Sequence, residues 1–124
     1  MHKQVPLILL VLVTAFSLTN CSKAIVNNDP VIGIWSRSQT LDQPAGKTVL
    51  REEWIFNDAY LGRYHRYSGV QLEAQTDFQW QAESGVYTIQ YPGLEKEADV
   101  VTIVKGPEGT LLEDLQGSIL ARRE

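Results

Sequence analysis

Thiol and imidazole side chains are almost missing from this chain of 124 residues, which holds one cysteine, Cys21, and two histidines, His2 and His65. A single cysteine leaves no second thiol for a disulfide within the chain, so the fold has to be stable through its core alone. Two histidines are too few for a multi-histidine metal site. The composition therefore predicts no metal, and no motif in the chain points to another cofactor.

Catalytic motifs are missing as well. The chain has no Gly-rich phosphate loop, no zinc-ligand spacing and no nucleophile elbow. No motif places a Ser or Cys nucleophile beside His65. No stretch shows a sustained helical period, and no internal repeat is visible. These absences predict a protein that is not an enzyme and that is built without helices.

What is present begins with an apolar amino-terminal segment. Lys3 lies in a short polar head, residues 5–13 are apolar throughout, and residues 14–18 stay weakly apolar. This run is shorter than the roughly 20 apolar residues that span a bilayer. A positive head, an apolar middle and a small or polar end are typical of a secretory signal peptide. We therefore expect residues 1–20 to be a signal peptide; a buried helix or a transmembrane anchor is the alternative.

The four residues Leu18-Thr19-Asn20-Cys21 resemble the lipobox of bacterial lipoproteins. Leu18, Thr19 and Cys21 match that pattern, and Asn20 is larger than the residue usually found before the cut. The resemblance implies that Cys21 becomes the mature amino terminus and carries a diacylglyceryl thioether and an amide-linked acyl chain such as palmitate. It further implies a membrane anchor and, with Ser22 next, the outer membrane facing the periplasm. A free, buried thiol at Cys21 is the alternative.

The remaining chain is one acidic domain. Without its first 20 residues the chain has 104 residues, with 10 Lys and Arg against 15 Asp and Glu, a net charge of −5. That size predicts one domain, and that charge makes nucleic acid a poor partner. The run Asn27-Asn28-Asp29-Pro30 has turn chemistry. We expect residues 21–30 to be the lipidated Cys and its tether, and residues 31–124 to be the domain.

The domain alternates between apolar and polar residues in short runs. In residues 48–57, for example, Leu50, Trp54 and Phe56 share one face, and Arg51 and Glu53 share the other. Turn residues separate about eight such runs at spacings near 8–12 residues, which favours an all-β sandwich or barrel. We expect loops at residues 41–47 and 71–76. Strands are expected over residues 31–39, 48–57, 62–67, 77–82, 86–91, 98–105, 110–115 and 118–122.

Three motifs together resemble the lipocalin-like domains of small bacterial lipoproteins. They are Gly33-Ile34-Trp35, then Glu53-Trp54-Ile55-Phe56-Asn57 with Gly62-Arg63-Tyr64, and finally Leu115-Gln116-Gly117-Ser118 with Arg122. The resemblance covers residues 31–123. It implies a single small antiparallel up-and-down barrel of about eight strands, with Trp35 packed across one closed end.

Bulky side chains in phase with one another are expected to point into such a barrel; they are Trp35, Trp54, Phe56, Phe78, Trp80, Tyr87, Ile89 and Ile103. They either fill the interior as core or leave a cavity for one small ligand. Glu52 shares their phase and would need a partner such as Arg37 or Arg66, unless it escapes to solvent at a strand end or bulge. The candidate ligand-binding residues are Trp54, Phe56, Phe78, Trp80, Tyr87, Glu52 and Arg66.

One further stretch combines basic and aromatic side chains, namely Arg63-Tyr64-His65-Arg66-Tyr67. It either meets phosphate or sugar groups of the envelope or forms a solvated sheet face. The leading functional hypothesis is a lipid-anchored envelope protein that binds a small apolar or amphipathic molecule. The alternative is a filled barrel that docks an envelope protein.

Overall fold

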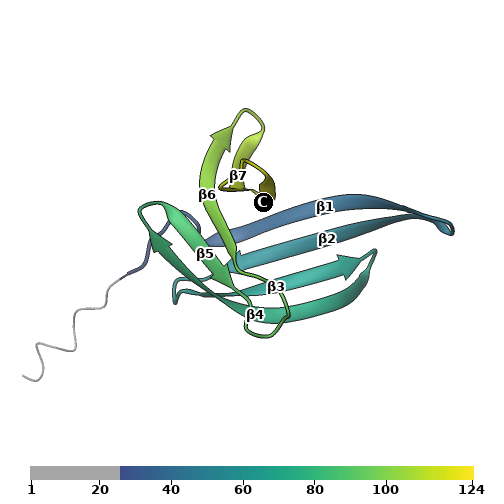
Figure 1. Ribbon diagram of the computed structural model, residues 1–124, viewed down its shortest axis with the longest axis horizontal. Coiled ribbons are helices and arrows are strands. Elements are labelled where there is room, and N and C mark those ends of the chain that lie inside the picture. Colours follow the sequence, from purple (N-terminus) through teal and green to yellow (C-terminus); the bar gives the residue numbers. More distant parts are fainter. Residues whose placement is uncertain (1–25) are drawn as a thin grey trace, which may run out of the picture.

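The computed structural model describes residues 26–124, which form one closed antiparallel sheet of eight strands in chain order and contain no helix (Figure 1). The predicted all-β, up-and-down barrel is confirmed, and its form is consistent with a small lipocalin-like barrel. The strands are β1 (Gly33–Gln43), β2 (Gly46–Phe56), β3 (Leu61–Ser68), β4 (Gln71–Glu83), β5 (Val86–Gln90), β6 (Asp99–Gly106), β7 (Gly109–Asp114) and β8 (Ile119–Arg123).

The register of the strands follows the alternation of the sequence. Trp35 of β1 lies opposite Trp54 of β2, and Trp54 lies opposite Tyr64 of β3, so that these rings share the inner face. Every second residue of a strand points to the same face, and the inner face is the apolar one. The buried hydrophobic core consists of Val31, Trp35, Trp54, Phe56, Tyr64, Phe78, Trp80, Tyr87, Ile89, Tyr91, Val101, Leu112, Leu120 and Ala121.

The loop predicted over residues 41–47 is wrong. β1 continues to Gln43, β2 begins at Gly46, and only Pro44 and Ala45 form the turn. Leu41 pairs with Thr48, and Gln43 pairs with Gly46. The error has a physical cause, because this part of the hairpin covers no core and both its faces meet solvent. Without a buried face, the residues show no apolar alternation.

The loop predicted over residues 71–76 is also wrong, for a different reason. These residues are the first half of β4, which pairs with β3 from Ser68 opposite Gln71 to Leu61 opposite Gln79. The register shifts between Arg66 and Tyr67, which lie opposite Ala74 and Leu72. Such a β-bulge reverses the in-out phase of a strand. The period of two is therefore broken over residues 71–76, and the sequence shows no strand pattern there.

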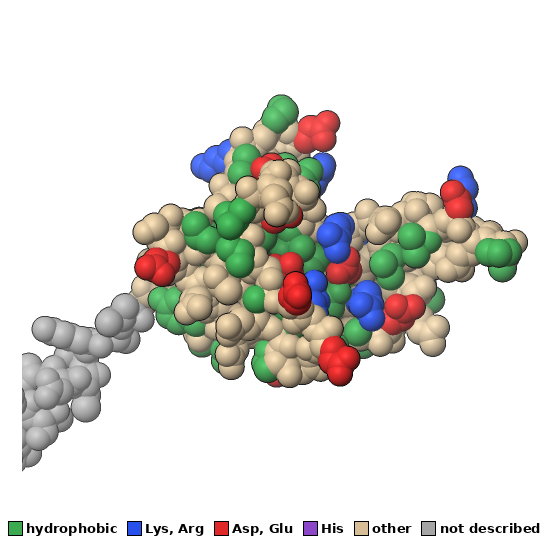
Figure 2. Space-filling view, in the orientation of Figure 1, with side chains coloured by type: hydrophobic (Ala, Val, Ile, Leu, Met, Phe, Trp, Pro, Cys, Tyr) green, Lys and Arg blue, Asp and Glu red, His purple; other side chains and the backbone are tan. Residues whose placement is uncertain are grey.

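The first four strands extend beyond the closed part of the barrel. β8 pairs with β1 only at Trp35 and Ser36, and β5 pairs with β4 only from Gln79 onward. The remainder of the β1–β4 sheet, residues 37–50 and 66–77, is called the arm below. Figure 1 shows the arm projecting from the body, at the end opposite Val26. Figure 2 shows acidic and basic side chains side by side where the arm joins the body.

The opposite end of the barrel is closed around Trp35. The indole Nε1 of Trp35 donates a hydrogen bond of 2.8 Å to the Val31 carbonyl, and the Arg123 guanidinium lies 5.0 Å from the ring centroid. Arg123 also donates to the carbonyls of Pro30 and Ile32. Gly33 has a φ of +135°, and a side chain there would press against Arg123. This explains physically why glycine stands two residues before Trp35.

The segment before β1 is bound to this closed end. The Tyr87 hydroxyl donates a hydrogen bond of 2.6 Å to Oδ1 of Asp29, and Asn27 donates to the Asp58 carbonyl. The last residues of the predicted tether therefore pack against the barrel. Cys21 and the predicted signal peptide lie outside the described residues. Residues 26–124 include no helix long and apolar enough to cross a membrane.

Candidate functional site

The interior of the barrel is packed with aromatic rings. Phe56 contacts Phe78 with ring centroids 4.9 Å apart, and Trp80 extends this cluster toward Tyr87. Offset and edge-to-face contacts at such separations are favourable beyond the area that they bury. An eight-stranded barrel is just wide enough either to be filled by side chains or to hold one small ligand. Here the aromatic side chains occupy the interior as core.

A buried carboxylate marks the junction of barrel and arm. Glu52 is 8% exposed and points inward, as its phase predicts. The Tyr64 hydroxyl donates a hydrogen bond of 2.5 Å to its Oε2, and the Arg37 guanidinium binds Oε1 through Nε at 3.0 Å and through a second nitrogen. A buried charge needs such partners to offset its lost hydration. Of the two predicted partners, Arg37 is the one that binds Glu52.

A second chain of hydrogen bonds crosses the interior close by. The indole Nε1 of Trp54 donates to the Tyr91 hydroxyl at 2.8 Å, and that hydroxyl donates to Oδ2 of Asp99 at 2.6 Å. Burial and the neighbouring carboxylates raise the pKa of both Tyr64 and Tyr91 above the usual value of 10.0. Both hydroxyls therefore stay protonated at neutral pH and act as fixed donors.

The structure brings six of the seven predicted ligand-binding residues together inside the barrel. Trp54, Phe56, Phe78, Trp80 and Tyr87 are core, and Glu52 is saturated by its partners. Arg66 differs, because its guanidinium lies 3.6 Å from the Glu73 carboxylate and is half-exposed on the arm. No buried side-chain nitrogen or oxygen in residues 26–124 lacks a hydrogen-bond partner. The polar atoms of the buried residues are thus paired within the protein, and none is free to bind a ligand inside the described barrel.

Sequence reasoning did not include Tyr64, Tyr91 and Asp99 among the inward polar groups. For the two tyrosines, the alternation of the sequence contains this information. Tyr91 shares the phase of Tyr87 and Ile89, and Tyr64 is opposite in phase to His65. Nothing in the sequence pairs Asp99 with Tyr91, because a loop of eight residues separates the two strands that bring them together. That contact depends on how the loop closes the barrel.

The basic aromatic stretch of β3 is divided between two faces. Tyr64 and Arg66 share the inner face, whereas Arg63 and His65 lie on the outer face with Tyr67. On the outer face Arg63 pairs with Asp77, and His65 Nδ1 lies 3.3 Å from Glu53. The three basic side chains therefore do not form one continuous surface, because Arg66 lies on the inner face. The alternation of the strand separates that side chain from the other two basic residues.

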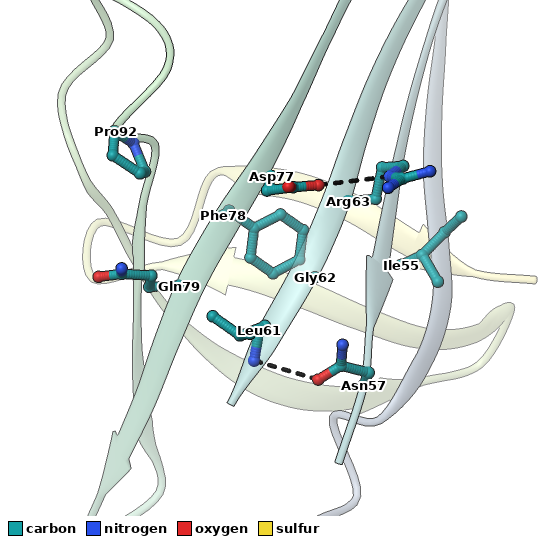
Figure 3. Close-up of a pocket in the computed structure, with 9 residues that line it drawn as sticks. All are labelled: Ile55, Asn57, Leu61, Gly62, Arg63, Asp77, Phe78, Gln79 and Pro92. Atoms are coloured by element: carbon teal, nitrogen blue, oxygen red, sulfur yellow. Dashed lines mark hydrogen bonds and ion pairs between the residues drawn. The ribbon is translucent and has the colours of Figure 1, made fainter. Parts of the chain in front are cut away.

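A surface depression lies on the outer wall formed by β2, β3 and β4. It has a volume of about 550 Å³, within the range of small-ligand sites. Figure 3 shows Leu61, Ile55 and Pro92 around the ring of Phe78, with the Arg63–Asp77 ion pair at one side. Leu61 is 45% exposed and provides apolar surface at its floor. This depression, called the outer groove below, combines an apolar floor with a charged rim.

The chain matches no protein-family model, no curated protein and no solved structure with which it was compared. Among residues 26–124, no three His, Cys, Asp or Glu side chains are grouped so that they could hold a metal ion.

Proposed function

We propose that this chain is a lipid-anchored protein of the bacterial cell envelope, whose filled barrel docks another envelope protein through its outer surface. The observation that carries the docking proposal is the packed interior. The candidate ligand-binding side chains contact one another, so recognition falls to the outside of the barrel. The proposal includes no catalytic step. An apolar floor with a polar rim, as in the outer groove, is the usual anatomy of a protein-docking surface.

The anchor is proposed on Cys21, with the outer membrane and its periplasmic face as the location. The apolar segment before Cys21 and its likeness to a lipobox support this proposal. Three acyl chains bury many methylene groups at about 0.8 kcal/mol each, which makes the attachment far firmer than that of one chain. Because Asn27 and Asp29 are bound to the barrel, the closed end of the barrel would lie next to the membrane.

Replacing Cys21 with Ala is expected to leave an uncut precursor without acyl chains. The measurement is incorporation of labelled palmitate and the mass of the chain after membrane fractionation. A Ser22→Ala variant is the matched control and should be processed like the original chain. Acylation and cleavage that persist in Cys21→Ala would disprove the anchor.

A photo-crosslinking amino acid in place of Arg63, at the rim of the outer groove, is expected to give one dominant adduct with another protein in cells. The same amino acid in place of Ser84, on the β4–β5 turn, is the control and should give none. Leu61 is 45% exposed on the groove floor, so Leu61→Asp should remove the adduct while leaving the barrel folded. An adduct of equal strength at Ser84, or one that survives Leu61→Asp, would overturn docking at this groove.

A second candidate function is supported by the same apolar floor, which could take a small amphipathic molecule beside the Arg63–Asp77 pair. In this second candidate function, the ligand binds in the outer groove and not in the interior of the barrel, where the sequence predicts it. Native mass spectrometry of the chain released gently from envelopes separates the two candidates. A bound small molecule that is lost in Leu61→Asp would favour the ligand, whereas the bare chain together with the protein adduct would favour docking.

A further inference from the structure

The outer edge of β1 beyond Ser36 has no neighbouring strand among residues 26–124. β8 pairs with β1 only at Trp35 and Ser36, although β1 continues to Gln43. The Ile34 carbonyl accepts a hydrogen bond from the Glu124 amide, so even-numbered residues of β1 direct their backbone groups toward this side. Ser38, Thr40 and Asp42 therefore present N–H and C=O groups that no strand within residues 26–124 pairs. In Figure 1, β1 forms one rim of the arm.

The two edges of the arm are protected to very different degrees. Bulges, charges and covering loops keep natural sheet edges from pairing with other strands. The β4 edge has all three, with a bulge opposite Arg66 and Tyr67, the charges of Glu73 and Asp77, and Gly93 of the β5–β6 connection packed against Thr76. The β1 edge has no proline and no bulge between Arg37 and Gln43. The free edge that is open to pairing is therefore that of β1.

We propose that two copies of this chain pair through their β1 edges, antiparallel and around a twofold axis at Thr40. In this register Thr40 faces the second copy's Thr40, and Ser38 faces the second copy's Asp42. All three positions direct their backbone groups outward, so each pair can exchange two hydrogen bonds, about six in total. No like charges lie opposite one another. A closed, self-complementary contact of this kind is the usual basis of a homodimer.

The body of each copy offers a place for the tip of the other arm. A depression of about 490 Å³ lies where β8 separates from β1, lined by Ser36, Arg37, Ser38, Ile119, Ala121, Arg122 and Arg123. Continued past Asp42, the second copy's hairpin brings its Pro44–Ala45 turn to this depression. Ile119 is 47% exposed there and provides an apolar surface for these two small residues.

Charge supports the same register. Arg122 lies opposite Ser36 and on the outer face, where its ion pair with exposed Glu108 is loose at 3.6 Å. The second copy's Asp42 shares that face and comes next to Arg122 when it lies opposite Ser38. The contact goes beyond the proposed docking function, because it joins the chain to its own copy. It uses no residue of the outer groove, so either proposal can fail without the other.

Thr40→Cys in the full chain, oxidised mildly in cells, tests the proposal. An antiparallel hydrogen-bonded pair has Cα atoms about 5.5 Å apart, which suits a disulfide. We expect a disulfide-linked species of twice the chain's mass, at least tenfold more abundant than in two controls. The first control is the unaltered chain, whose only thiol is Cys21. The second is Gln75→Cys, at an exposed position on the protected β4 edge.

A charge exchange then tests the register. Asp42→Arg in the Thr40→Cys chain should lower the linked species at least tenfold, because it places two arginines together. Adding Arg122→Asp should restore it, since the pair is present again with its signs reversed. Linkage of Thr40→Cys no stronger than that of Gln75→Cys would overturn the dimer. So would linkage mainly to a different protein, which would make the edge a docking site for a foreign strand.

Discussion

Gly62→Ala is expected to lower the free energy of unfolding by about 3 kcal/mol, at the upper end of overpacking effects. A Cβ at Gly62 would overlap with the ring of Phe78 and with the Ile55 carbonyl oxygen. Phe78 is fully buried and packed against Phe56, so its ring has no free space to move into. The carbonyl belongs to the β2–β3 ladder and cannot rotate away. Urea denaturation followed by tryptophan fluorescence measures the loss.

Gly106→Ala is the matched control. Gly106 also lies in a strand, and the nearest atom to a Cβ there is 3.6 Å away. We expect this variant to change stability by less than about 1 kcal/mol. Phe78→Leu should cost less in the Gly62→Ala background than alone, because the smaller side chain makes room. Equal stability losses in Gly62→Ala and Gly106→Ala would show that the packing of Phe78 against Gly62 is not tight.

Glu52→Ala should be the second most damaging change, at about 2–3 kcal/mol of unfolding free energy. The substitution removes the acceptor of the buried Tyr64 hydroxyl and the partner of Arg37. Breaking a buried ion pair on one side typically costs more, about 3–5 kcal/mol. The Arg37 side chain is 40% exposed and can turn to water, which lowers the cost. Urea denaturation of the single and double variants of Glu52 and Arg37 gives the coupling energy.

The control for Glu52→Ala is Glu53→Ala, at the neighbouring residue on the opposite face of β2. Glu53 lies on the outer side of the sheet and pairs with Arg51, whose side chain is 38% exposed, and with His65. Glu53→Ala leaves no buried hydroxyl without its acceptor, so we expect it to cost less than about 1 kcal/mol. A stability loss in Glu53→Ala as large as that in Glu52→Ala would contradict the distinction between the two faces. It would also remove the reason for treating the Glu52 cluster as part of the core.

The fold could be predicted from the sequence wherever one face of a strand is buried in the core and the other meets solvent. Leu50, Trp54 and Phe56 alternate with charged residues because one side of β2 meets the core, and the predicted barrel is confirmed there. The arm could not be predicted in the same way. Water meets both faces of residues 41–47, so no apolar period marks them as strand. The short seam between β1 and β8 depends on where the barrel closes, which local pattern does not record.

The phase of Glu52 predicts its inward direction but not its partner. Arg37 and Arg66 both lie directly opposite Glu52, one on each neighbouring strand, so spacing alone treats them alike. The bulge in β4 decides between them, because its extra residue, Glu73, lies beside Arg66. Arg37 is left to bind Glu52. A bulge of this kind has no apolar signature, and the sequence therefore leaves both partners open.

The binding of Asp29 and Arg123 at the closed end has a mechanical consequence. A pulling force applied at Val26 would reach the Asn27–Asp58 hydrogen bond first, then the Tyr87–Asp29 bond, and then the two bonds from Arg123 to Pro30 and Ile32. Only after these contacts break would the load pass to the two-residue seam between β1 and β8, the shortest strand pairing of the barrel. The hydrogen bonds of Asp29 and Arg123 thus protect the short β1–β8 pairing from tension that is applied at the amino-terminal end.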